Sequence, residues 1–369
     1  MQLNRLNKRP RSGVLVHMKK QASIKDVARE AGVSAATVSY ILNDTPNLSF
    51  TPETKERVFA AVEKLHYVGS QAAKTLGSSR VRGNVQSKLI GVVIPQTENK
   101  RTESHIMFGN PFYGTFLSAI ELEIRKAGYH LILSGTNPGQ SYIEIVKSRA
   151  LDGVIILGAY PFGDEAEYKK YKVPAVLVDC YGNDDSFFYG VRTDDRLGGY
   201  LATKYLIEKG HRNIAIVTGE LHQYGVNSER YEGYLAALRE AGIRPVKKNV
   251  FEGYVGYKYG AEVGRKLAQK RENITAAFVT SDIAAVGLIN GLHENGLLVP
   301  EDLSVIGFDD IEYAKMCFPG LTTIRQNIME KGRQAAQLMI SAAMDHALSR
   351  EERVIPIELI ERGTVRENI

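Results

Sequence analysis

Residues 23–42 read SIKDVAREAGVSAATVSYIL, a pattern of two short amphipathic helices separated by a tight turn. The first helix begins with a capping box at Ser23, and apolar residues follow it at helical spacing. Gly32 permits a left-handed turn, and Ser34 is suited to cap the second helix. A third helix begins at Pro52, a residue favoured in the first turn of helices. This part of the chain therefore predicts a helix-turn-helix unit of three helices.

The chain has 369 residues, and its net charge of +5 is unevenly distributed. Residues 1–17 contain four basic side chains and no acidic one, and residues 18–80 contain nine basic against six acidic side chains. The rest of the chain is slightly acidic. A basic N-terminal part on an acidic body indicates a small module that binds a polyanion, joined to a larger domain of another kind. Residues 1–20 are expected to be a disordered basic extension.

The composition excludes several classes of protein. Hydrophobic residues make up 44% and charged residues 24% of the chain, as in ordinary globular proteins. The longest apolar runs, such as residues 154–157, are too short to span a bilayer. Two distant cysteines, Cys180 and Cys317, offer neither a disulfide framework nor a zinc site, and no cofactor is expected. The N-terminus lacks the apolar segment of a signal peptide, so we expect a cytoplasmic protein.

The N-terminal unit resembles a known family. The strings IKDVAREAGVS at residues 24–34, ATVS at 36–39 and TKERV at 54–58 are similar to the headpiece of the lactose-repressor (LacI/GalR) family of bacterial transcription regulators. The resemblance implies a DNA-binding headpiece over residues 21–68, whose second helix enters the major groove of an operator. It places the DNA contacts at Ser34, Ala35, Ala36, Thr37, Ser39, Tyr40, Asn43, Thr54, Lys74 and Leu76.

These contacts differ in their expected roles. The two alanines of the second helix can offer only apolar contact to bases, whereas Tyr40 adds a hydroxyl where family members often carry Arg or His. The small polar side chains suit phosphates, although each is equally suited to capping a helix. Residues 69–77 resemble the hinge helix of the family, in which Leu76 enters the minor groove and bends the duplex. Residues 78–88 are expected to be a linker.

From residue 89 onward, short strand-like runs alternate with helical patterns. Such alternation predicts doubly wound parallel sheets, which bind ligands at the carboxyl ends of their strands. Six blocks resemble the family in the same order: NPFY, GHRNIA, SERYEGY, SDIAAVG, SVIGFDD and LTTI. The resemblance implies an α/β effector domain of two lobes over residues 89–369, like that of periplasmic sugar-binding proteins. We expect lobe one over residues 89–191 and 309–322, lobe two over residues 192–308 and 323–369, and crossovers near residues 191–194, 308–310 and 321–324.

The resemblance also places an effector cleft between the lobes. Its expected lining is Phe112, Tyr113, Tyr160, Asp179, Arg230, Tyr254 and Asp282. Aromatic faces suit sugar rings or bases, and a guanidinium with carboxylates suits hydroxyl groups. Arg230 and Asp282 have a plainer alternative, a salt bridge within the fold. Tyr224 and Val226 replace the polar pair of the purine-responsive members, which favours a sugar over a purine.

These features predict a sequence-specific DNA-binding regulator that is associated with the nucleoid, a repressor that acts as a homodimer on a palindromic operator. A small-molecule effector, expected to be a sugar, would set its operator affinity by changing the orientation of the lobes. Control by a nucleoside or by a protein corepressor is left open by the sequence. The helix-turn-helix disfavours a sugar-binding transport protein. The lack of dinucleotide, phosphate-loop, metalloprotease and nucleophile-elbow motifs disfavours an enzyme.

Replacing Leu76 by alanine tests the hinge interpretation. The alanine side chain is too short to insert between base pairs and stabilise the bent operator. Leu76→Ala should therefore weaken operator binding by about tenfold or more. Binding to random duplex depends on phosphate contacts and should change far less. Fluorescence anisotropy with both duplexes measures the two affinities, and an equal loss on both would refute the wedge.

Overall fold

The computed structural model describes most of the chain in two compact units that divide between Val85 and Gln86. The described residues are 22–42, 48–67, 87–95, 110–136, 142–158, 166, 170, 173–182, 188–270, 273–344 and 351–368. Outside these ranges lie the predicted extension, the hinge helix, most of the linker, and the site residues Asn43, Lys74, Leu76 and Tyr160. No helix in the described ranges is both long and apolar enough to cross a membrane.

The N-terminal unit consists of three helices: α1 (Ile24–Ala31), α2 (Ala35–Leu42) and α3 (Pro52–Lys64). The capping box of α1 is present, since Ser23 and Asp26 each accept a hydrogen bond from the backbone N–H of the other. Gly32 ends α1 in the left-handed conformation, with a φ of 65°. The three helices meet in one small core, to which each contributes a fully buried valine: Val27, Val38 and Val58. The predicted helix-turn-helix is therefore present.

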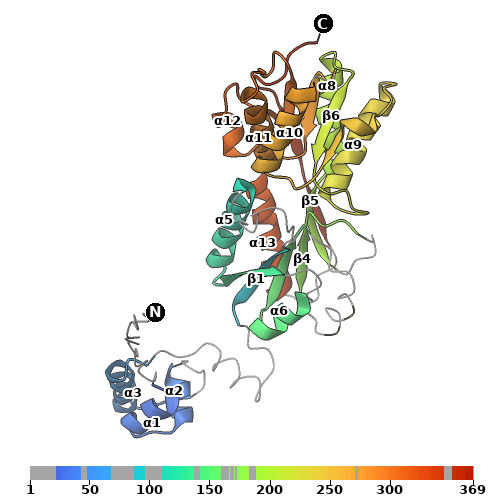
Figure 1. The fold of residues 1–369 in the computed structure, drawn as a ribbon. Helices are drawn as coiled ribbons and strands as arrows, with labels where there is room; N and C mark the ends of the chain where they lie inside the picture. The colour runs from blue at the N-terminus through green and yellow to red at the C-terminus, as the bar shows by residue number, and fades with distance from the viewer. Residues whose placement is uncertain are drawn as a thin grey trace, which may run out of the picture. The chain divides into compact units, whose positions relative to one another are not determined.

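Lobe one of the second unit contains a parallel sheet in the order β11-β5-β4-β3-β1-β2. Its strands are β1 (Leu89–Pro95), β2 (His130–Thr136), β3 (Gly153–Leu157), β4 (Ala175–Val178), β5 (Tyr189–Thr193) and β11 (Glu352–Ile355). Val92 and Ile155 face one side of the sheet, Val93 and Ile156 the other, because successive side chains of a strand alternate. The first side packs on two adjacent helices, α5 (Pro111–Lys126) and α13 (Ile328–Met344) (Figure 1). The second side packs on α6 (Tyr142–Arg149).

Lobe two contains a second sheet in the order β12-β10-β9-β8-β6-β7, parallel except for β12. Its strands are β6 (Ile214–Thr218), β7 (Val250–Glu252), β8 (Ala276–Val279), β9 (Ser304–Asp309), β10 (Thr322–Gln326) and β12 (Ile357–Ile360). One face packs on α8 (Asp195–Glu208) and α9 (Val226–Glu240), the other on α10 (Tyr257–Lys270) and α11 (Asp282–His293). Two short helices complete the lobe: η2 (Lys247–Asn249) and α12 (Glu312–Met316). The doubly wound α/β architecture expected for both lobes is thus present.

The chain passes between the two sheets at three places. The first crossover leads from β5 into α8 at residues 193–195, close to its expected position. The second and third follow β10 and β11, at residues 326–328 and 355–357. The predicted crossover near residues 308–310 was wrong. The crossover predicted near residues 321–324 lies a few residues further along the chain. The described residues of lobe one therefore lie within 87–193 and 328–355, and those of lobe two within 195–326 and 357–368.

The error has a physical reason. Residues 308–310 mark the end of a strand. The local sequence at a strand end is similar whether the chain then crosses to the other lobe or returns to the same sheet. Here β9 is a parallel neighbour of β10, and α12 forms part of the connection between them. Residues 309–322 consequently belong to lobe two and not to lobe one, whereas α13 and β11 belong to lobe one.

Candidate functional site

The surface expected to contact DNA lies on α2 of the N-terminal unit. One side of α2 faces the core, which leaves Ala36 and Tyr40 exposed on the other side. Ser34 caps the helix, since its hydroxyl oxygen accepts the backbone N–H of Thr37 at 3.0 Å. The remaining described contact residues are partly exposed: Ala35, Thr37, Ser39 and Thr54. The helix therefore presents small side chains and one tyrosine to solvent.

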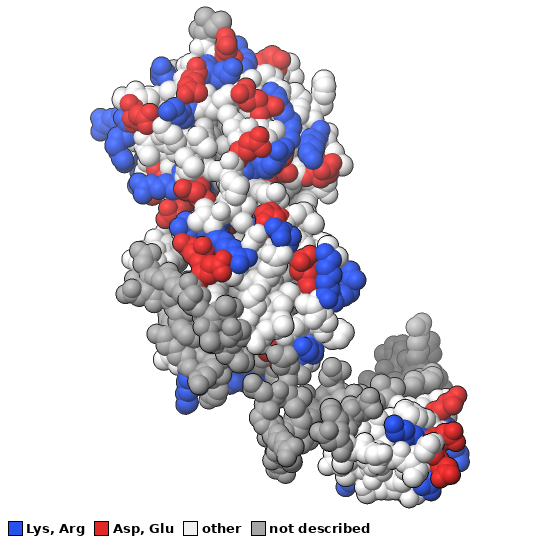
Figure 2. Space-filling view, turned by 180° about the vertical axis from the view of Figure 1, so that it is seen from behind, with Lys and Arg blue, Asp and Glu red and all other residues white. Residues whose placement is uncertain are grey.

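The surface of the second unit carries mixed charge. In the view of Figure 2, Lys and Arg alternate with Asp and Glu over both lobes, and no extended field of one sign is visible on this face. Some of these charges pair within one helix at a spacing of four residues, as Arg125 with Glu121 and Lys266 with Glu262 do. Exposed pairs of this kind contribute little to stability. The buried charges are more informative.

Arg230 and Asp195 form a buried ion pair in lobe two. Arg230 extends from the first turns of α9, and Asp195 begins α8. Nε and Nη2 of Arg230 each lie 2.8 Å from Oδ1 of Asp195, and Nη1 donates to the carbonyl oxygen of Thr280 at 2.6 Å. The two helices can approach this closely because Gly199 has no side chain; a Cβ there would lie 2.0 Å from the carbonyl oxygen of Arg230. The guanidinium also stacks on Phe308, 3.6 Å from the ring centroid.

A second buried ion pair joins Lys331 of α13 to Asp179, which follows β4. Nζ of Lys331 lies 2.7 Å from both carboxylate oxygens of Asp179 and 3.4 Å from Oγ1 of Thr193, and it also donates to Oε1 of Gln326. Gln326 ends β10 in lobe two, whereas the other three residues belong to lobe one. The ammonium group therefore connects the two lobes. Burial raises the pKa of Asp179, and the neighbouring Lys331 opposes this shift.

Asp309, the last residue of β9, is linked to both ion pairs. Its carboxylate accepts hydrogen bonds from the amide of Gln326 at 2.6 Å and from the hydroxyl of Ser281 at 3.1 Å, while Nη1 of Arg230 lies 3.9 Å away. Asp309 has a φ of 121° and Asp179 a φ of 51°, and such strain in non-glycine residues is concentrated at functional sites. Both residues lie at the carboxyl ends of strands, where α/β folds bind ligands.

Aromatic side chains lie beside these charges. Phe112 and Tyr113, in the first turn of α5, meet edge to face with ring centroids 5.5 Å apart. Burial raises the pKa of Tyr113 to about 12, and three neighbours add to the shift: Tyr254, Asp309 and Asp179. The phenol of lobe one therefore lies close to polar groups of both lobes.

The structure thus brings together five of the seven residues expected in the cleft: Phe112, Tyr113, Asp179, Arg230 and Tyr254. Four residues of the same network were not predicted from the sequence: Asp195, Asp309, Gln326 and Lys331. The first three lie at or next to the ends of strands, so the rule that places ligands there could have found them. Lys331 carries no such signal, because it falls within a helical pattern.

Asp282 has a different environment. It is fully buried at the start of α11 and accepts hydrogen bonds from Oγ1 of Thr323 at 2.6 Å and from the backbone N–H of Ile311 at 3.0 Å. The alternative interpretation, a salt bridge with Arg230, was wrong, because Arg230 pairs with Asp195. Burial, followed by the charge of Asp309, raises the pKa of Asp282 well above its ordinary value. Its hydrogen bonds connect α11 to β10 and to the start of α12.

Comparison with known proteins accounts for both units. A model described as bacterial regulatory proteins, lacI family, matches residues 23–70, and a model for a periplasmic binding protein-like domain matches residues 203–365. The HTH-type transcriptional repressor PurR of Pasteurella multocida is 31% identical over 354 residues, which cover 94% of this chain and 100% of the relative. The chain belongs to the lacI family of bacterial regulatory proteins.

Two solved structures show the same likeness to this lacI-family protein. A lac repressor dimer bound to operator and the anti-inducer ONPF has a TM-score of 0.72 and 25% identity, over 94% of this chain and 100% of that one. A complex of the transcriptional regulator CelR with cellobiose has a TM-score of 0.66 and 26% identity, over 93% and 99%. The chain is a DNA-binding transcriptional repressor and, like its relatives, not an enzyme.

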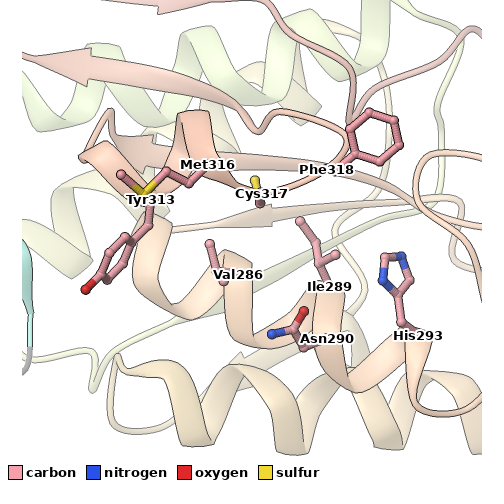
Figure 3. A pocket seen from close by; sticks show the side chains of 8 residues that line it. All are labelled: Val286, Ile289, Asn290, His293, Tyr313, Met316, Cys317 and Phe318. Carbon is pink, nitrogen blue, oxygen red and sulfur yellow. The ribbon is translucent and has the colours of Figure 1, made fainter.

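The repressor also has an open pocket of about 280 Å³ in lobe two, lined by both polar and apolar side chains of α11, α12 and the residues after α12 (Figure 3). Its lining consists of Val286, Ile289, Asn290, His293, Tyr313, Met316, Cys317 and Phe318. Three of these large side chains are exposed, Tyr313 by 45%, Met316 by 68% and Phe318 by 93%. Clustered exposed apolar side chains often mark a surface that another molecule covers.

Replacing Asp282 by asparagine tests its structural role. Because the pKa of Asp282 is higher in the folded state than in the unfolded chain, its ionisation lowers stability as the pH rises above about 4. Asp282→Asn keeps the shape and cannot ionise. One of the two hydrogen bonds that Asp282 accepts is lost at all pH values, because the amide nitrogen cannot accept it. Urea denaturation between pH 4 and 8 should therefore show that the stability of the variant relative to the wild type rises with pH, by about 1.4 kcal/mol for each unit of pKa shift removed. Asp302→Asn, at an exposed aspartate, is the control. A difference independent of pH would contradict this account.

Proposed function

We propose that this repressor responds to a sugar bound between its lobes. The observation that carries the proposal is the set of buried polar groups at the carboxyl ends of β4 and β9, beside the aromatic rings of α5. Carboxylates accept hydrogen bonds from sugar hydroxyls, a guanidinium donates to them, and aromatic rings pack on the apolar face of a sugar. The proposed effector contacts are Phe112, Tyr113, Tyr160, Asp179, Arg230, Tyr254 and Asp309, with Asp282 supporting them from within lobe two.

Two observations bear on the choice of effector. The CelR relative is described in complex with cellobiose, which supports a sugar. The PurR relatives favour a purine, which is the second candidate. Against a purine stand Tyr224 and Val226, where purine-responsive members of the family carry a polar pair. A sugar is therefore proposed first.

The effector would act through the relative orientation of the lobes. Among the described residues, a chain of hydrogen bonds from Lys331 through Gln326 to Asp309 crosses between them, and so does the hydrogen bond from Tyr181 to Asp195. A ligand that binds one orientation better than the other shifts the equilibrium toward it, by as much as its affinities differ. Operator affinity would follow that equilibrium, with α2 of each headpiece in the major groove.

A cytoplasmic homodimer is proposed. One headpiece contacts only half of a palindromic operator, so two copies are needed to occupy the whole site. The apolar surface around Phe318 is the proposed contact with the second copy. A two-fold axis would place the same exposed side chains of both copies against each other. The lac repressor relative was solved as a dimer on its operator, which supports a dimeric state.

The proposed function is tested first by capture of genomic DNA fragments bound to the purified protein. Fluorescence anisotropy on the enriched site, with monosaccharides, cellobiose and purine bases added in turn, then measures the effector response. A palindrome whose affinity changes with a sugar supports the proposal. A response to purines alone would replace the sugar by the second candidate, and the absence of any enriched site would refute the headpiece assignment.

Replacing Asp309 by asparagine should weaken the effector response. The amide keeps the shape but removes a charge that strengthens hydrogen bonds from hydroxyls, so about tenfold more effector should be needed to change operator affinity. Operator affinity without effector should be retained. Glu312→Gln, an exposed carboxylate three residues away, serves as the matched control. An unchanged effector titration for Asp309→Asn would remove Asp309 from the site.

Replacing Phe318 by aspartate should weaken the dimer. Exposed aromatic side chains are frequent anchors of protein interfaces, and a charge there would be buried without a partner. Sedimentation velocity should show dissociation at concentrations at least about tenfold higher than for the wild type. Leu298→Asp, at an apolar side chain of the same lobe that is 56% exposed, is the control. Identical sedimentation of Phe318→Asp and the wild type would place the dimer contact elsewhere.

A further inference from the structure

Lys331 is an unusual residue for a buried site. Its side chain is completely buried, although it lies in the first turns of α13, where the helix dipole disfavours a cation. A buried ammonium is tolerated when it is fully paired. Here its donors are all used within the protein, on Asp179, Thr193 and Gln326.

The charges of the network are not balanced. Among the residues that the structure describes there, Arg230 pairs with Asp195 and Lys331 with Asp179. The donors at hydrogen-bonding distance from the third carboxylate, Asp309, are uncharged. Two cations thus stand against three carboxylates. An acidic ligand would add a further acidic group in a place where burial already raises the pKa of Asp309 and so disfavours negative charge.

A cationic ligand would be attracted by that charge, but its natural position is already taken. An ammonium group is best held by a carboxylate together with an aromatic ring. In this cleft the carboxylate is Asp179 and the ring is Phe112, and Nζ of Lys331 lies 2.7 Å from the first and 5.9 Å from the centroid of the second. A second cation would be repelled there by Lys331.

We propose that Lys331 is a specificity-determining residue of the effector site. Its ammonium occupies the cation position beside Asp179 and Phe112, so the site takes an uncharged ligand with hydroxyl groups and rejects amine-bearing and acidic analogues. A hydroxyl both donates to carboxylates and accepts from Arg230, as this network requires. The inference rests on the proposed function of the cleft and defines the chemical class of its effector.

The test uses the full-length protein and three sugars that share one ring and differ in charge: glucose, glucosamine and glucuronate. Matched sets of galactose and mannose derivatives extend it to other ring configurations. Operator affinity by fluorescence anisotropy and melting temperature by differential scanning fluorimetry are measured for the wild type and for Lys331→Met. Methionine keeps the packing of the lysine stem without its charge.

For the wild type, we expect responses to uncharged sugars alone. For Lys331→Met, the ratio of the response to an amino sugar over that to its uncharged partner should rise at least tenfold, because Asp179 has lost its resident cation. Adding Asp179→Asn to Lys331→Met should abolish this gain. Lys204→Met, which removes a partly exposed lysine of α8, should behave as the wild type.

An equal response of the wild type to the amino and uncharged sugars, a response to glucuronate, or an unchanged ratio in Lys331→Met would overturn the proposal. If the wild type responds to no sugar, the proposed sugar effector fails. The role of Lys331 is then decided by Lys331→Met alone. A shift in its melting temperature with an amino sugar supports that role, and no shift refutes it. If Lys331→Met does not fold, Lys331→Gln, which keeps a hydrogen-bond donor, takes its place.

Discussion

The pairing of buried charges where the two sheets meet is the constraint on which the second unit depends. Asp195 accepts hydrogen bonds from Arg230 of lobe two and from Tyr181 of lobe one, the latter at 2.6 Å. Removing one partner of such a pair leaves an uncompensated buried charge, at a cost of about 3–5 kcal/mol. The close contact between α8 and α9 at Gly199 helps to form this ion pair, because it brings Arg230 within reach of Asp195.

These bonds also give the cleft a defined state before any ligand enters. The proposed effector would have to compete with Gln326 and Ser281 for Asp309, and with the protein's own cations for the other carboxylates. In the proposed mechanism, the difference between its affinities for two lobe orientations would then come from exchange of hydrogen bonds rather than from filling of empty space. The positive φ of Asp309 and of Asp179 shows that the backbone accepts strain to hold these acceptors in place.

The local parts of this structure could be predicted from the sequence, and the long-range parts could not. The headpiece is defined by short-range signals, such as the capping box at Ser23 and the left-handed Gly32. The strands of both lobes follow from their composition. The lobe to which a strand belongs depends on partners far away in the chain: β11 pairs with β5, and Glu352 bonds Arg192 across 160 residues. No local pattern records such a contact.

The same limit applies to the cleft. The resemblance named Arg230 and Asp179, which lie in the network, and Asp282, but it did not name Asp309, although both Asp282 and Asp309 follow or end a buried strand. Their difference lies in what surrounds them, since Asp282 bonds Thr323 and Ile311 while Asp309 lies near Arg230. Lys331 was missed because its partner Asp179 lies 152 residues away.

All three crossovers lie at the same edge of the two sheets, beside β11 and β5 in lobe one and beside β12 and β10 in lobe two. If one lobe rotates against the other about this edge, each strand moves in proportion to its distance from the edge. β1, the strand that follows the headpiece and linker in the chain, lies four strand positions from β11, or about 19 Å at normal strand spacing. A rotation of about 10° would displace β1 by about 3 Å. Because of the strand order, a small change in lobe orientation would therefore produce a larger displacement at the strand nearest the headpiece in the chain.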